Sequence, residues 1–144
     1  MIRGVIFLQS ADRIVPMDIN IPIDVSAKKT LLVEPAVTAQ HIGSGSVHVL
    51  ATPMLIALME AAALEAVQAY LSQGWITVGT KVEVEHVRAT PLGEVVTAEA
   101  VLIRQEGRSL TFSVLAKDSS GIIGQGRHQR FLVEKEKFLE KLKK

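Results

Sequence analysis

Glu60 is the charged residue with the least favourable sequence surroundings, because its neighbours on both sides are apolar. A carboxylate in the middle of the apolar run at residues 56–64 cannot easily reach water, and a carboxylate held in this way is a candidate general base or nucleophile. Two structural explanations compete with that interpretation. Glu60 could lie on the one solvated stripe of a helix, or it could pair with a basic residue.

His86 is the second residue that could carry chemistry. It alternates with Val82 and Val84, whereas charged residues occupy the positions between them. Because successive side chains of a strand point to opposite faces, His86 is predicted to lie on the inward face. An imidazole in that position could transfer protons. The alternative is a buried histidine that is satisfied by one backbone hydrogen bond.

Thr52 precedes Pro53 at the predicted start of a helix, where threonine is a preferred N-cap and proline a preferred first residue. A hydroxyl there lies beside amides without intrahelical partners, which can polarise a carbonyl oxygen. Capping alone would also explain Thr52. Thr52 and Glu60 are eight positions apart, or about 12 Å along one helix. We therefore expect the carboxylate to reach a shared substrate from a partner chain across a twofold axis.

The remaining polar candidates are weaker. His128 and Arg130 alternate onto one side of residues 124–130, and this segment could meet an anionic group, although a polar edge strand would explain the same pattern. His41 and His48 flank a Gly- and Ser-rich loop without the spacing or companions of a metal site, so we predict no metal. The sequence contains no phosphate loop, dinucleotide fingerprint or nucleophile elbow.

One helix and several strands must position these residues. From residue 53 to about 72 only two charges interrupt the apolar residues, which is typical of a buried helix, and Gly74 is its predicted stop. Strands are predicted at residues 28–33, 37–39, 80–87, 94–105, 109–117 and 122–133, and a solvated terminal helix at 134–144. Short turns between consecutive long strands predict an antiparallel meander in an α+β fold, with the sheet curled around the helix.

Composition limits the classes of partner. With 16 basic and 15 acidic residues the net charge is +1, so neither nucleic acid nor an anionic membrane is an expected partner. The absence of cysteine excludes disulfides and a cysteine nucleophile, and it suits the cytoplasm, where we expect the protein. The 144 residues predict one domain at residues 17–144, preceded by an N-terminal arm or extension at residues 1–16.

Several short motifs occur in a specific order. They are Val-Leu-Ala-Thr at residues 49–52, Leu-Met-Glu at 58–60, Gly-Thr at 79–80, Val-Glu-His at 84–86, Ala-Thr-Pro-Leu-Gly at 89–93, and Gly-Gln-Gly at 124–126 followed by His128 and Arg130. Over about residues 28–138 the chain thereby resembles the fluoroacetyl-CoA thioesterase-like branch of the hot-dog acyl-CoA thioesterases. The resemblance implies the hot-dog fold, a curved antiparallel sheet wrapped around a long central apolar helix.

The resemblance also implies the site. Its catalytic residues correspond to Thr52, Glu60 and His86, and its lining residues correspond to Gly79 and Arg130. We add His128 to the predicted substrate-binding residues because it shares a side with Arg130. The family's dimer, with active sites at the subunit interface, implies a homodimer or higher homo-oligomer. It implies an acyl-CoA substrate and no separate cofactor, since coenzyme A is part of the substrate.

The predicted reaction is hydrolysis of a thioester to a carboxylic acid and free coenzyme A. Glu60 would act as base or nucleophile, His86 would transfer protons, and Thr52 with the helix N-terminus would polarise the carbonyl. The alternatives are a hot-dog hydratase or dehydratase on acyl-CoA, and a non-catalytic acyl-CoA binding protein. Fluoroacetyl-specialised members carry a phenylalanine-bearing lid where this chain has Gly43-Ser-Gly-Ser46, so the acyl group is left open.

Overall fold

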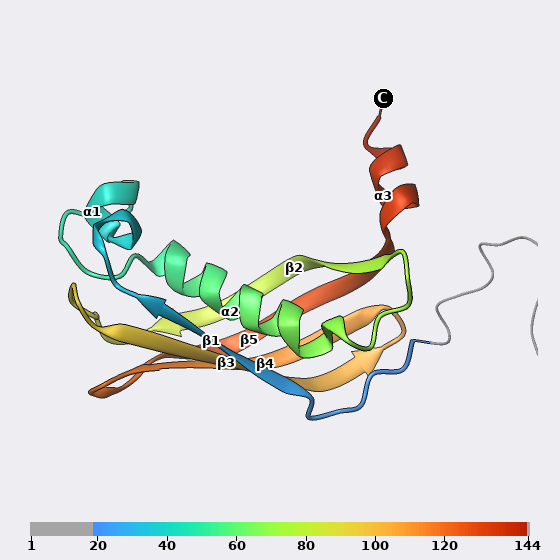
Figure 1. The fold of residues 1–144 in the computed structure, drawn as a ribbon, viewed down its shortest axis with the longest axis horizontal. Helices are drawn as coiled ribbons and strands as arrows, with labels where there is room; N and C mark the ends of the chain where they lie inside the picture. The colour runs from blue at the N-terminus through green and yellow to red at the C-terminus, as the bar shows by residue number, and fades with distance from the viewer. Residues whose placement is uncertain (1–18, 144) are drawn as a thin grey trace, which may run out of the picture.

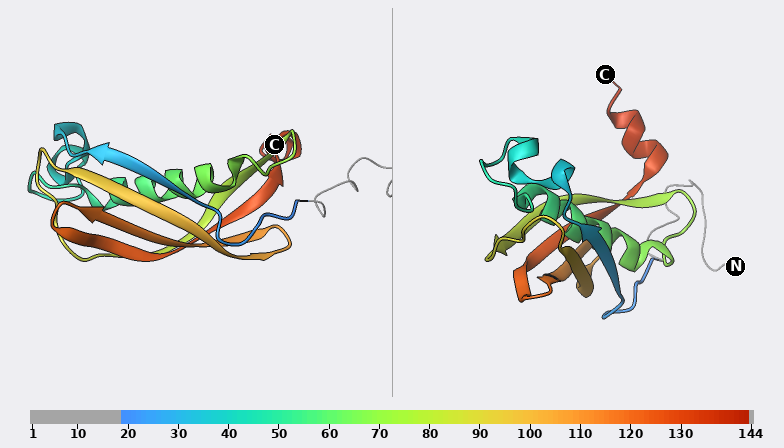
Figure 2. Two further views of the ribbon diagram at one scale, coloured as in Figure 1. Left: turned by 60° about the horizontal axis from the view of Figure 1, so that its bottom comes forward. Right: turned by 60° about the vertical axis from the view of Figure 1, so that its left-hand side comes forward.

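The computed structural model describes residues 19–143, and the predicted arm at residues 1–16 lies outside them. A five-stranded sheet curves around one long helix (Figures 1 and 2). The strands are β1 (Ser26–Leu32), β2 (Trp75–His86), β3 (Val95–Glu106), β4 (Ser109–Asp118) and β5 (Gly121–Glu134). The helices are the 3-10 turn η3 (Pro35–Val37), α1 (Ala39–Ile42), the long α2 (Thr52–Gln68) and α3 (Lys135–Lys141).

The strand order is β1-β3-β4-β5-β2, and every pair is antiparallel. The predicted meander is confirmed for β3, β4 and β5. It is wrong for β2, which pairs with β5 and not with the next strand along the chain. The residues between β2 and β3 pair elsewhere, because the Leu50 N–H donates to the Thr90 carbonyl and the Gly93 N–H donates to the Val33 carbonyl. Consequently β1 and β2 form the two edges of the sheet.

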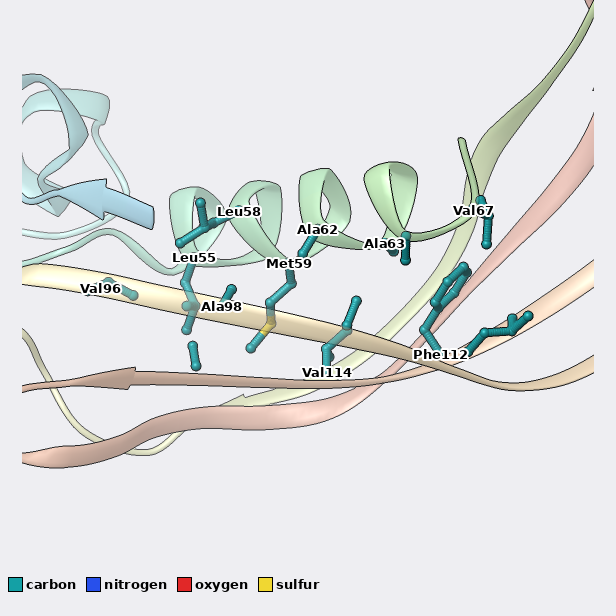
Figure 3. Packing of buried hydrophobic residues seen from close by; sticks show 14 of the residues in the cluster. Leu55, Leu58, Met59, Ala62, Ala63, Val67, Val96, Ala98, Phe112 and Val114 are labelled. Atoms are coloured by element: carbon teal, nitrogen blue, oxygen red, sulfur yellow. The ribbon is translucent and has the colours of Figure 1, made fainter. Parts of the chain in front are cut away.

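The core lies between α2 and the inner face of the sheet. Inward side chains of β3 and β4 are fully buried at alternate positions, namely Val96, Ala98, Ala100, Leu102, Leu110, Phe112, Val114 and Ala116. Figure 3 shows Leu55, Met59 and Ala62 of α2 pointing toward this face. Burying each large apolar side chain contributes about 1.5–3 kcal/mol. These contacts fix α2, and therefore the functional side chains that it carries, against the sheet.

Three details of the helical segments differ from the sequence predictions. The helix ends at Gln68 and not near residue 72, and Gly74 lies in the turn before β2 with φ of 87°. The strand predicted at residues 37–39 is wrong, because the Thr38 hydroxyl accepts from the His41 N–H at 3.3 Å and begins α1.

Among the described residues, no helix has the combination of length and apolar character needed to span a membrane.

The prediction of a buried helix is confirmed only for the side of α2 that faces the sheet. The side of α2 away from the sheet carries a stripe of exposed or half-exposed small and apolar residues, namely Pro53, Ile56, Ala57, Ala61 and Leu64. In Figure 2 no described element covers this side of the helix. The stripe (Pro53, Ile56, Ala57, Ala61 and Leu64) is therefore an uncovered apolar face.

Candidate active site

The first cluster of predicted site residues lies where α2 begins and β2 ends. The Thr52 hydroxyl lies 2.7 Å from Nδ1 of His86, within hydrogen-bonding distance. The predicted N-cap role of Thr52 is wrong, since Ala51 occupies the cap position and no side chain caps the helix. The hydroxyl is therefore engaged by the imidazole and not by the helix, and the structure brings Thr52 and His86 together.

The His86 ring is partly buried, as the strand alternation predicts. Burial lowers the pKa of His86 from the ordinary value of 6.5, and the nearby Arg88 backbone opposes part of this shift. Nε2 is buried and has no hydrogen-bond partner within residues 19–143. A neutral imidazole with one nitrogen at a hydroxyl and the other unpartnered is suited to proton transfer.

A pocket of about 300 Å³ lies beside Thr52 and His86. Its lining is Ala39, Ser44, Val49, Leu50, Thr52, His86, Val87, Arg88 and Ala89. Apolar side chains and polar groups both line it, and such a combination can bind a small molecule. Another hollow, of about 220 Å³, lies on the outer face of the sheet among Lys81, Arg104 and Arg127, and none of the predicted site residues lines it.

The second cluster surrounds Glu60, farther along α2. Nη1 of Arg130 lies 3.9 Å from Oε2 of Glu60 and 3.1 Å from Nε2 of His128. A Cβ on Gly79 would lie 2.7 Å from Oε2 of Glu60, so the absence of a side chain on β2 gives the carboxylate its space. Four predicted site residues, Glu60, Gly79, His128 and Arg130, thus lie together.

The expectation that Glu60 cannot reach water is wrong for the single chain, because its side chain is 40% exposed. Glu60 is four residues from both Ile56 and Leu64, so it borders the uncovered stripe while its carboxylate faces Arg130. Of the structural alternatives, the ion pair with a basic residue is confirmed by Arg130, whose side chain is only 8% exposed. Glu60 is therefore anchored on its inner side and accessible on its outer side.

Thr77 is a further member of the second cluster that the sequence did not indicate. Its hydroxyl accepts from Nε of Arg130 at 2.8 Å, and its carbonyl accepts from Nη2 at 3.1 Å. The alternation along β2 is interrupted by a bulge between Gly79 and Lys81, so residues before Thr80 and residues after it are out of phase. The sequence would place Thr77 on the inner face of the sheet only if the strand were predicted to begin before residue 77 and to contain this bulge.

Asp118, the last residue of β4, supports the first cluster. Its carboxylate accepts from the Thr90 hydroxyl at 2.8 Å and from Arg88 at 3.3 Å, while its own side chain is only 3% exposed. These bonds tie the segment that follows His86 to the body of the sheet. An aspartate next to a predicted turn is common, so the sequence offers no signal for this role.

The two clusters are separate within one chain. Thr52 begins α2 and Glu60 lies near its middle, which places them about 12 Å apart along the helix axis. The first cluster offers a hydroxyl and a neutral imidazole, and the second offers a carboxylate held by an arginine. Within the described chain, no group of three or more His, Cys, Asp or Glu residues could hold a metal ion.

Comparisons with known proteins agree on one relationship. The sequence profile of a family described as fluoroacetyl-CoA-specific thioesterase matches residues 33–136. The fluoroacetyl-CoA thioesterase of Streptantibioticus cattleyicolor is 41% identical over 95 residues, which cover 66% of this chain and 68% of that protein.

Solved structures give the same result. A structure of the fluoroacetyl-CoA thioesterase superimposes with a TM-score of 0.80 at 33% identity, covering 85% of this chain and 96% of that one. A hot-dog-like protein from Thermanaerovibrio acidaminovorans superimposes with a TM-score of 0.78 at 23% identity, covering 85% of this chain and 90% of that one, which shows the shared fold. The predicted hot-dog architecture is confirmed.

Proposed function

This chain belongs to the fluoroacetyl-CoA-specific thioesterase family and is a thioester hydrolase acting on acyl-CoA, and we propose that its active site forms between two copies of the chain. In this proposal Thr52 and His86 of one subunit and the partner's Glu60 act on one thioester carbonyl. One observation carries the proposal. Thr52 and Glu60 lie on the same helix, but Thr52 contacts His86 in one cluster whereas Glu60 contacts Arg130 in another.

The uncovered face of α2 supports the pairing of two chains. Two α2 helices packed antiparallel about an axis near Ile56 would place Thr52 of one chain opposite the partner's Glu60, because Ile56 is midway between these positions. Ala57 and Ala61 are small enough to allow close approach of the helices. The edge strand β2 contacts α2 and could pair with its copy. Burial of this surface would also remove water from Glu60.

The chemistry requires a nucleophile and stabilisation of the oxyanion, because a thiolate is a good leaving group with a conjugate acid that titrates near 8.5. The partner's Glu60 would activate water or attack the carbonyl directly, and His86 would take up and deliver protons. The Thr52 hydroxyl and its backbone amide would face the carbonyl oxygen. Pro53 has no N–H, and the Met54 and Leu55 amides already donate to the Ala51 carbonyl, so Thr52 is the donor available there.

The acyl group would occupy the pocket of about 300 Å³ beside Thr52 and His86. Ser44, on the glycine- and serine-rich loop after α1, lines this pocket. The loop presents no aromatic side chain to this pocket. We therefore propose a substrate acyl group larger than the two-carbon group of the family's namesake.

The test uses two inactive variants, Glu60→Ala and His86→Ala, and a panel of short, branched, aryl and long acyl-CoA esters. Each variant alone should release little thiol. Mixing them after mild dissociation should restore about a quarter of wild-type activity, because half of the random dimers are mixed and each contains one intact site. A mixture that stays inactive while mixed dimers are demonstrably present would overturn the intersubunit site. Glu60→Ala mixed with Glu60→Gln is the matched control and should stay inactive.

A further inference from the structure

His128 and Thr77 form a buried cradle around Arg130. The His128 side chain is 2% exposed and the Thr77 residue 5% exposed, so neither presents a free surface to a ligand in the described chain. His128 also packs against the Phe112 ring, with ring centroids 6.2 Å apart. Any function of these two side chains must therefore act through the group that they bind, which is the Arg130 guanidinium.

We propose that His128 and Thr77 are positioning residues that fix the Arg130 guanidinium beside the Glu60 carboxylate. This inference rests on the proposed function, in which Glu60 is a reacting group. Three of the N–H groups of Arg130 have fixed acceptors, at the Thr77 hydroxyl (2.8 Å), the Thr77 carbonyl (3.1 Å) and Nε2 of His128 (3.1 Å). The guanidinium plane is thus held from two sides, while Nη1 faces Glu60 at 3.9 Å.

The partners define the tautomer of His128. Arginine can only donate, so Nε2 of His128 accepts; the Lys81 carbonyl can only accept, so Nδ1 at 2.8 Å carries the hydrogen. The ring must therefore be neutral. Protonation would place an N–H of His128 against an N–H of Arg130 and would displace the guanidinium. The neutral ring thus makes His128 an acceptor that a lysine or arginine could not replace.

The bulge in β2 explains the orientation of the His128 ring, whose Nε2 accepts from Arg130. The register of β2 against β5 shifts between Gly79 and Lys81, and the Lys81 carbonyl then points to Nδ1 of His128. Thr77 lies on the other side of the same bulge and presents both its hydroxyl and its carbonyl to Arg130. One irregularity of the edge strand therefore positions both walls of the cradle.

The surroundings of His128 shift its pKa in opposite directions. Burial lowers the pKa of His128, its hydrogen bond to the Lys81 carbonyl raises it, Arg130 lowers it and Glu60 raises it. Phe112 covers one ring face and contributes no charge. A fixed cation beside Glu60 stabilises negative charge on the carboxylate, less strongly than in a dry interior because Glu60 is 40% exposed in the single chain.

The experiment uses paired variants of the full chain. Thr77→Val keeps the shape and removes the hydroxyl, whereas Thr77→Ser keeps it. His128→Asn keeps a donor near Nδ1 and removes the acceptor at Nε2, whereas His128→Gln keeps an acceptor near Nε2. We expect Thr77→Val and His128→Asn to lower kcat by about tenfold or more with KM nearly unchanged, and the conservative partners to restore most of it.

A second readout is independent of activity. The Nε–H of Arg130, bonded to Thr77 and buried, should give a resolved, slowly exchanging NMR resonance in the wild type and in Thr77→Ser, and it should be lost in Thr77→Val. Wild-type kcat in Thr77→Val and His128→Asn, or a loss that only follows the folded fraction, would overturn the inference. If the wild type hydrolyses no acyl-CoA ester, the proposed function fails, and the Arg130 resonance alone then decides whether the cradle exists.

Discussion

The Thr52 hydroxyl lies 2.7 Å from Nδ1 of His86, so the first residue of the long helix is hydrogen-bonded to the last residue of an edge strand. The bond joins two elements that are far apart in the sequence. It leaves Nε2 as the nitrogen without a partner among residues 19–143. The pair thus holds the imidazole in one orientation at the pocket.

Removing the Thr52 hydroxyl should impair catalysis without unfolding the protein. Thr52→Ala removes both the donor toward the carbonyl oxygen and the group that orients His86, so kcat/KM for thiol release should fall by about a hundredfold. Thr52→Ser should retain most of the activity. Thr30→Ala, on an exposed position of β1, is the control. Activity of Thr52→Ala within twofold of the wild type would exclude the assigned role.

Activity should persist to a lower pH than an ordinary histidine would allow. Burial lowers the pKa of His86 from 6.5, so the imidazole stays neutral and able to accept a proton somewhat below that pH. The kcat/KM profile should be flat near pH 7 and should fall on the acid side with a midpoint below 6.5. The measurement is thiol release across pH with the fold monitored by circular dichroism. A midpoint above 6.5 in folded protein would contradict the assignment.

Stability should fall as the solution is acidified through the same range. The pKa of His128 is lower in the folded chain than the ordinary 6.5, so the unfolded chain binds more protons between those two values. The resulting stabilisation is complete above about pH 6.5 and is lost as the pH falls toward the folded pKa. Urea unfolding at pH 7.5 and 5.5 should show a larger decrease for the wild type than for His128→Gln. Equal decreases would indicate that His128 does not titrate on unfolding.

The fold was largely predictable because its signals are local. The apolar run of α2, the alternation of β3 and β4, and the glycine turns each follow from a short stretch of sequence. The pairing of β2 with β5 could not be predicted in that way, since it depends on where the residues between β2 and β3 find partners. Thr90 and Gly93 find them in Leu50 and Val33, which are distant in the sequence.

The sequence indicates candidate site residues more readily than it indicates their local geometry. Thr52, Glu60 and His86 stand out by type and surroundings, but the exposure of Glu60 depends on the uncovered side of α2, which periodicity did not show because alanines occupy both faces. Thr77 is hidden by the bulge that reverses the alternation of β2. Packing and backbone irregularities, and not residue type, decide these details.

Gly79→Ala should separate activity from stability. The added methyl would lie 2.7 Å from Oε2 of Glu60, 3.3 Å from Cε1 of His128 and 3.4 Å from Nη1 of Arg130. The shortest contact is with the flexible carboxylate, which would move away from Arg130. We expect kcat to fall strongly while the free energy of unfolding changes by about 1 kcal/mol or less, because the displaced group is the end of a long side chain. Adding Glu60→Gln to Gly79→Ala should cause little further loss, since both changes act on one carboxylate. Fully additive losses would show that Gly79 acts elsewhere.

Ser44→Phe tests whether the pocket beside Thr52 and His86 determines the size of the acyl group. Ser44 lines this pocket of about 300 Å³, and a phenyl ring there would fill part of it. We expect kcat/KM for branched or aryl acyl-CoA esters to fall by about tenfold or more relative to acetyl-CoA, because steric exclusion of bulk from a pocket discriminates by that order. Ser113→Phe adds the same ring at an exposed position of β4 and should leave the ratio unchanged. An equal effect of Ser44→Phe on all esters would place the acyl group outside this pocket and assign the glycine- and serine-rich loop a role other than selecting the substrate.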